Sequence, residues 1–169
     1  MPIDGRHSLL LGLALLTACP DDDGEALECY DVSNSTNSVD APVCAFPKPC
    51  DEVRYAESAS CEVSATYDPA AGACVVEALR SGEPAELLIR DCPGGQFAER
   101  LRLQTFGDGT VLWDEAAFLD IGGDGRATWR ALPDAAHFDA CSTDTIDALL
   151  ACLDAILAEA CQPGEPSCG

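Results

Sequence analysis

Cysteine is the residue that most constrains how this chain can fold. Eleven cysteines occur among its 169 residues, and no two are spaced as C-x-x-C, the spacing of zinc ribbons and of thioredoxin-like redox sites. Ten of them follow Cys19, and an even number in an exported chain predicts disulfides. The disulfide candidates are Cys29, Cys44, Cys50, Cys61, Cys74, Cys92, Cys141, Cys152, Cys161 and Cys168.

The N-terminus has the pattern of a signal peptide. A largely apolar run covers residues 8–18, directly before Cys19. A helix that crosses a bilayer needs about 20 apolar residues, so this run is too short to remain as a membrane span. We therefore expect residues 1–18 to be a signal peptide that is removed after export.

The last four residues of this pattern, Leu16-Thr17-Ala18-Cys19, resemble the lipobox of bacterial lipoproteins. The resemblance implies that Cys19 receives a thioether-linked diacylglycerol and becomes the first residue of the mature protein. In Gram-negative members a third acyl chain on its amine is usual. Two or three acyl chains give lasting attachment, whereas one binds only marginally.

The alternative is an ordinary secretory leader in which Cys19 falls at this position by chance. Eleven cysteines would then be exported, and one thiol would lack a partner. If Cys19 carries lipid instead, the ten remaining cysteines can all pair. In some bacteria an aspartate after the acylated cysteine favours the inner membrane, but Pro20 stands here. We expect a cell-envelope protein at the outer membrane or periplasmic face, with the cell surface as an alternative.

Acidic residues dominate the charge of the chain. Thirty Asp and Glu face nine Lys and Arg, giving a net charge of −21. Such a chain lacks the basic stripe that binds nucleic acid, and it is repelled by anionic lipid. The membrane is therefore expected as a partner only through the N-terminal lipid. Solubility explains the charge most simply; recruitment of a basic protein partner in the envelope is the alternative.

The first half of the chain is predicted to be mainly irregular. Residues 31–42 are rich in Ser, Asn and Asp, which predicts a loop within an acidic, Ser/Asn-rich tether over 19–42. Residues 43–67 are expected to be irregular, with a short strand near 62–67. Asp68 followed by Pro69, with Gly82 at the far end, predicts a helix over 69–81; a hairpin from Cys74 to Cys92 is the competitor.

Residues 86–131 are predicted to form an antiparallel meander of four or five strands. Apolar and polar residues alternate over 100–104, as on a strand with one buried face. Two similar segments, 107–113 and 123–129, each place an Asp-Gly turn before a strand that contains a tryptophan, as hairpins require.

An amphipathic helix is the clearest element and ends the chain. It is expected to begin in the segment 141–144, and Pro163-Gly164 should stop it. On such a helix Cys152 and Cys161 lie about 13 Å apart, too far for a disulfide, so each must reach another part of the fold. Cys161 with Cys168 is the simplest pairing. The fold class is α+β: a small meander between two helices, forming one disulfide-stapled domain over 43–169.

Few residues in the mature chain could support catalysis. His137, with Asp134 or Asp139, could form a Ser-His-Asp arrangement, but no G-x-S-x-G segment exists, so we interpret His137 as a partly exposed surface residue. Paired acids such as Asp114-Glu115 leave a carboxylate hydrolase open. The segment 120–131 faintly resembles a calcium loop but fails two ligand positions, and no phosphate-binding glycine motif occurs. We predict no catalytic, metal or cofactor-binding residues.

Two functional hypotheses follow. The first is a non-enzymatic interaction or structural module of the envelope, which predicts an exposed apolar or aromatic patch. The second is a small carboxylate hydrolase acting on cell-wall or sugar polymers, which predicts a groove holding two carboxyl groups. A disulfide-rich inhibitor with a rigid exposed loop is a third alternative.

Overall fold

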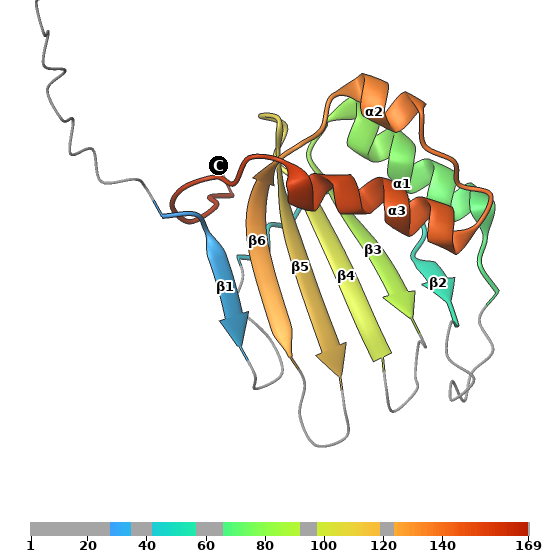
Figure 1. The fold of residues 1–169 in the computed structure, drawn as a ribbon, viewed down its shortest axis with the longest axis horizontal. Coiled ribbons are helices and arrows are strands. Elements are labelled where there is room, and N and C mark those ends of the chain that lie inside the picture. Colours follow the sequence, from blue (N-terminus) through green and yellow to red (C-terminus); the bar gives the residue numbers. More distant parts are fainter. Residues whose placement is uncertain (1–27, 35–41, 57–65, 92–97, 119–123, 169) are drawn as a thin grey trace, which may run out of the picture.

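The fold is a six-stranded sheet with helices on one face. The computed structural model describes residues 28–34, 42–56, 66–91, 98–118 and 124–168. The strands follow the spatial order β1-β6-β5-β4-β3-β2, and α1 and α3 form a layer over the sheet (Figure 1). The elements are β1 (Asp31–Asn34), β2 (Val53–Tyr55), α1 (Pro69–Ser81), β3 (Ala85–Asp91), β4 (Ala98–Thr105), β5 (Thr110–Phe118), β6 (Gly125–Ala131), α2 (Ala135–Asp139) and α3 (Ile146–Ala158). The predicted α+β class is confirmed.

The predicted meander is confirmed as the four antiparallel strands β3 to β6. The turn between β4 and β5 uses Gly107 and Gly109 at φ of 81° and 82°, where residues with a side chain are strained. Between them, the Asp108 carboxylate accepts a hydrogen bond from the backbone N–H of Thr110 at 3.0 Å. Local turn chemistry therefore fixes this hairpin, as the Asp-Gly pattern indicated.

Both edge strands differ from the sequence prediction. The expected loop over 31–42 is wrong in part, because residues 31–34 form β1 and pair antiparallel with β6. β2 pairs parallel with β3, at residues that we expected to be irregular. Of the predicted strand over 62–67, residues 62–65 lie outside the described residues, and 66–67 are not in a strand. Strands of three and four residues carry almost no periodic signal, so tertiary pairing decides them.

Helix α1 lies where its capping signals predicted it. The Asp68 carboxylate accepts a hydrogen bond from the Ala70 N–H, and Gly82 ends the helix in the left-handed conformation at φ 67°. The competing hairpin over these residues is wrong. Helix α2, five residues long with buried Phe138, was not predicted because so short an element has no clear period.

Helix α3 is shorter at both ends than the sequence suggested. Its N-cap is Thr145, whose hydroxyl accepts a hydrogen bond from the Ala148 N–H, and its last residue is Ala158. The chain then leaves the helix to pair with β6, where the Ala131 N–H donates to the Ala160 carbonyl at 2.8 Å. Sheet pairing, rather than Pro163, therefore ends α3. Neither α3 nor any other helix among the described residues is long and apolar enough to cross a membrane.

The main core lies between the sheet and the helices. Its fully buried members include Val75 and Leu79 of α1, Leu103 of β4, and Leu149 and Leu153 of α3. The opposite face of the sheet carries a smaller aromatic cluster.

That second cluster is covered by the segment 43–49. Phe46 packs edge-to-face on Phe106 with ring centroids 5.3 Å apart. The buried amide of Gln104 donates to the Cys44 carbonyl at 3.0 Å, which satisfies a polar group beneath an otherwise irregular segment.

Four disulfides lie among the described residues, with Cα–Cα distances of 5.3 to 5.7 Å, within the normal range. The guess that Cys161 pairs with Cys168 is wrong, since each pairs with a cysteine near the N-terminus. The prediction that Cys152 and Cys161 do not pair with each other is confirmed, although its premise is wrong, because α3 ends at Ala158 and Cys161 lies beyond the helix. Cys61 and Cys92 lie outside the described residues. The four pairs are Cys29–Cys161, Cys44–Cys168, Cys50–Cys74 and Cys141–Cys152.

Candidate ligand-binding cleft

A cleft of about 750 Å³ opens on the helix-covered face of the sheet, beside α3. Its size lies within the range of small-molecule sites. The middle strands form its base, and α3 forms one wall with Leu150 and Asp154. We call it the acidic cleft; the side chains that the argument uses are Tyr55, Leu101, Trp113, Leu150, Glu99, Glu115, Asp124, Arg126 and Asp154.

The floor of the acidic cleft is apolar and aromatic. Trp113 of β5 is 3% exposed and Tyr55 of β2 is 8% exposed, and both belong to the main core. Leu101 and Leu150 are partly buried against the same core. These side chains are held by packing, so the floor is rigid before any ligand arrives.

The rim of the acidic cleft carries four carboxylates. In β4 and β5, Glu99 lies opposite Ala117 and Leu101 lies opposite Glu115, and alternate residues of a strand share a face. Glu99 and Glu115 therefore lie on the same face of the sheet. Asp154 of α3 and Asp124, directly before β6, are both exposed and complete the rim.

Two arginines line the acidic cleft, Arg100 and Arg126. Arg100 lies 3.5 Å from Asp114 on the other face of the sheet, and the charge of Arg126 is matched by Asp31 of β1. The Arg126 guanidinium donates to both carboxylate oxygens of Asp31, at 3.0 and 2.7 Å. These hydrogen bonds are the main cause of the lowered pKa of Asp31, with a smaller coulombic contribution from the same guanidinium. Since Asp31 balances Arg126, the rim keeps an excess of negative charge.

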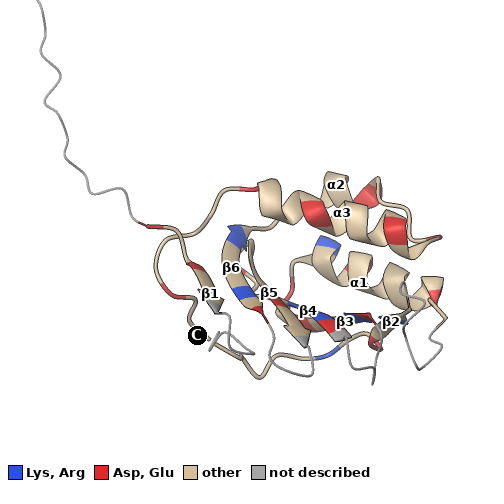
Figure 2. Ribbon diagram, turned by 60° about the horizontal axis from the view of Figure 1, so that its bottom comes forward, with Lys and Arg blue, Asp and Glu red and all other residues tan. Residues whose placement is uncertain are grey.

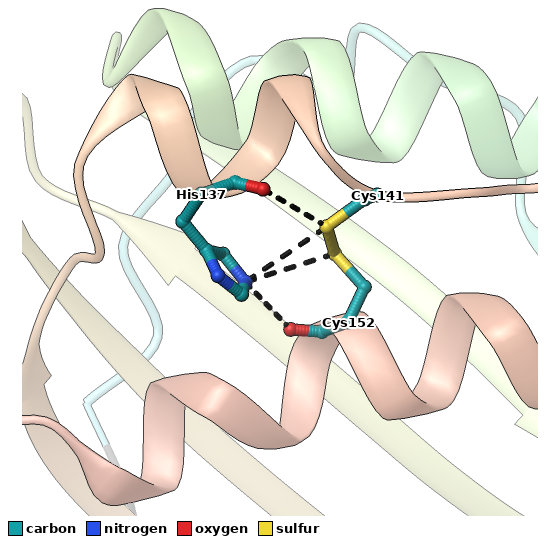
Figure 3. A group of neighbouring side chains, drawn as sticks. All are labelled: His137, Cys141 and Cys152. Atoms are coloured by element: carbon teal, nitrogen blue, oxygen red, sulfur yellow. Dashed lines mark hydrogen bonds between the residues drawn. A yellow bond between two sulfur atoms is a disulfide. The ribbon is translucent and has the colours of Figure 1, made fainter.

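His137 lies outside the acidic cleft, packed against a disulfide (Figure 3). Its Nε2 lies 3.0 Å from the Cys152 carbonyl oxygen, and 3.8 and 3.9 Å from the sulfur atoms of Cys141 and Cys152. With the proton on Nε2, the ring donates to that carbonyl. His137 is partly exposed, as the sequence predicted.

Neither acid near His137 in the sequence forms the triad that the sequence left open. The Asp134 carboxylate caps α2 by accepting from the backbone N–H of His137. The Asp139 carboxylate lies 3.7 Å from Nε of Arg80. Both acids therefore have structural partners, and Nε2 of the ring faces a carbonyl oxygen and two oxidised sulfurs rather than a nucleophile.

His137, Cys141 and Cys152 form the one group among the described residues with the donor types of a metal site. Cysteine binds a zinc ion as the thiolate. Here the two sulfurs are bonded to each other, so they are not thiolates in the oxidised protein. The geometry therefore fits a packed disulfide better than a metal centre.

The other acidic motifs of the sequence are separated by the fold. Asp114 and Glu115 are adjacent in β5 and therefore point to opposite faces of the sheet. Glu115 lines the acidic cleft, whereas Asp114 is buried on the other face beside Arg102. These two carboxylates cannot act on one substrate. The first four residues of the weak calcium motif, 120–123, lie outside the described residues, and Ala131 at its end lies in β6.

The apolar patch that we expected for an interaction module is not found in the described ranges. Only two large hydrophobic residues there are exposed, Val32 and Val43. The sequence reasoning missed the acidic cleft because its residues come from β2, β4, β5, β6 and α3. The alternation in β4 did place Leu101 on the buried face, but nothing local showed that α3 leaves this part of the sheet open.

Comparisons of the chain with protein-family models, with curated proteins and with solved structures find no match.

Proposed function

We propose that the protein is a non-enzymatic binding module of the bacterial cell envelope, attached to a membrane by lipid on Cys19. In this proposal the acidic cleft receives a positively charged segment of an envelope partner. The observation that carries the proposal is the combination of an aromatic floor with four rim carboxylates in a cleft of about 750 Å³.

The lipid anchor is supported by the lipobox resemblance and by the oxidised cysteines. Four disulfides among the described residues are typical of proteins in an oxidising compartment such as the periplasm or the cell surface. Cys29, ten positions after Cys19, is bridged to Cys161. Ten residues span at most about 35 Å when extended, so the domain would stay close to the membrane.

The charge of the acidic cleft favours a cationic ligand. A lysine or arginine side chain can lay its apolar stem on Leu101 and Leu150 while its charged end reaches the rim carboxylates. Because the whole chain has a net charge of −21, long-range attraction would also speed the encounter with a basic partner. Both effects weaken in salt.

Removing two rim charges should weaken the binding of a basic peptide. We expect Glu115→Gln with Asp154→Asn to reduce affinity for a hexalysine peptide by about five- to tenfold at low salt, since each exposed ion pair contributes up to about 1 kcal/mol. Isothermal titration calorimetry on the full mature chain measures this.

The matched control is Glu83→Gln with Glu165→Gln, which removes the same total charge at exposed positions outside the acidic cleft. The control should bind nearly as well as the unaltered chain. Equal weakening by both double variants would show that only net charge matters and would contradict a binding role for the cleft.

A carboxylate hydrolase is the second candidate, because Glu99 and Glu115 share one face of the acidic cleft. It predicts that the chain releases reducing sugars from cell-wall glycan and that Glu99→Gln and Glu115→Gln each abolish the release. Release of sugars that is lost in both variants would replace the binding proposal with the hydrolase. Binding of the basic peptide without any release of sugars supports the binding proposal.

A further inference from the structure

The sheet face that points away from the helices gathers most of the chain's basic residues. Seven arginines follow the leader, and four of them lie on neighbouring strands of this face. Arg54 of β2 lies opposite Arg90 of β3, which lies opposite Arg100 of β4. Arg102, two residues along β4, shares their face. We call these four residues the arginine row; β3 and β4 carry blue segments in Figure 2.

Such an arrangement is unfavourable by itself. Like charges directly opposite each other on neighbouring strands destabilise a sheet, and strands lie about 4.8 Å apart. Three guanidinium side chains in register are therefore unexpected in a chain with thirty acids and nine basic residues, unless anions hold them together.

Two carboxylates hold the row, and each is shared by two arginines. Glu52 lies 2.8 Å from Arg54 and 2.6 Å from Arg90. Asp114 contacts Arg102 and lies 3.5 Å from Arg100. The Glu52 carboxylate carries one negative charge against the two guanidinium groups of Arg54 and Arg90, so this end of the row has a surplus of positive charge. Lys48 and Glu86, farther along the same face, pair with each other at 2.9 Å.

The outer end of the row is open to solvent. The side chains of Arg54 and Arg90 are 62% and 43% exposed, while Arg100 and Arg102 are 24% and 12% exposed. The Nε of Arg102 is buried and has no hydrogen-bond partner in the described part of the chain. The buried arginines thus fix the position of the row, and the exposed ones present donors to a ligand.

We propose that the arginine row binds a phosphate group, carried by a free phosphorylated molecule or by a phosphorylated lipid head group. Guanidinium groups bind phosphate through paired hydrogen bonds. A phosphate has enough acceptor oxygens to bind Arg54 and Arg90 at once, and its negative charge offsets the surplus that Glu52 leaves. This face lies opposite the acidic cleft, so the proposal does not depend on a cationic partner there.

Phosphate binding is tested by calorimetry on the full chain with Cys19→Ser, which prevents acylation. The probes are inorganic phosphate, glycerol phosphate, acetate as a carboxylate probe, and vesicles of phosphatidylcholine with or without phosphatidic acid. We expect Arg54→Gln with Arg90→Gln to weaken phosphate binding about tenfold or more, since it removes charge-assisted hydrogen bonds. Glu52→Gln should strengthen binding by about threefold, because it frees both arginines from a competing anion.

The control is Arg80→Gln on α1, an exposed arginine paired with Glu77, which should leave phosphate binding unchanged. If vesicles with phosphatidic acid bind and the small phosphates do not, the head group is the source; the reverse result identifies a free molecule. The proposal is overturned if no phosphate probe binds, if acetate binds as well as phosphate, or if Glu52→Gln weakens binding. Should the double variant lose its near-ultraviolet circular dichroism, Arg54→Gln alone, at the edge strand, provides the same comparison.

Discussion

Removing both long-range disulfides, with all four cysteines changed to alanine, should lower the free energy of unfolding by about 8 kcal/mol. Cys29–Cys161 and Cys44–Cys168 span sequence separations of 132 and 124 residues. While one of them is present, the loop closed by the other is short. It runs through residues 29–44 and 161–168, and 15 + 7 gives 22 residues. The two bridges therefore restrict the unfolded chain together rather than independently.

The chain-entropy relation turns this into free energies of unfolding. Loss of one bridge, across an effective loop of 22 residues, costs about 3 kcal/mol, whereas loss of the second as well costs about 5 kcal/mol more. The sum of about 8 kcal/mol compares with a typical total stability of 5–15 kcal/mol. Guanidinium unfolding of the oxidised variants measures these differences.

The control is removal of Cys141–Cys152, whose sequence separation is 11 residues. Its removal should lower the free energy of unfolding by about 3 kcal/mol. If the variant without both long-range bridges is as stable as either single variant, the two bridges do not act together as described.

Asp114→Ala should destabilise the sheet strongly. The Asp114 side chain is 2% exposed and contacts Arg102, itself only 12% exposed. Removing one partner of a buried ion pair leaves an uncompensated charge, which typically costs about 3–5 kcal/mol of the free energy of unfolding. Urea unfolding at neutral pH measures the loss.

The matched control for that change is Asp31→Ala. Asp31 also pairs with an arginine, Arg126, but the two side chains are 37% and 47% exposed. Exposed pairs contribute at most about 1 kcal/mol. Equal losses for Asp31→Ala and Asp114→Ala would show that burial does not set the strength of the Asp114 pair.

The parts of the fold that the sequence predicted are those with strong local signals. Helix α1 has an N-cap acid and a proline at its start and a left-handed glycine directly after its end, and the β4–β5 hairpin has its Asp-Gly turn. The elements that the sequence did not predict depend on contacts between residues far apart in the chain. β1 exists because its residues pair with β6, and α3 ends where the chain joins the same strand.

The candidate sites likewise combine features that the local sequence predicts with features that depend on nonlocal contacts. The alternation in β5 places Glu115 and Asp114 on opposite faces of the sheet, a fact that holds for any strand. The acidic cleft also needs Asp154 of α3 beside Glu115 of β5. The arginine row needs the parallel register that sets Arg54 opposite Arg90. That register cannot be predicted from the spacing of the arginines in the sequence.

The mass of the intact protein, isolated from native membranes and measured before and after reduction, tests the central proposal most directly. The account predicts a chain that begins at Cys19, carries the mass of two or three acyl chains, and has no free thiol. Eight of the ten later cysteines form the four described bridges, and we expect Cys61 and Cys92 to form a fifth, so reduction should add ten hydrogens. A chain that begins elsewhere, lacks acyl mass, or has free thiols among those ten cysteines would contradict it.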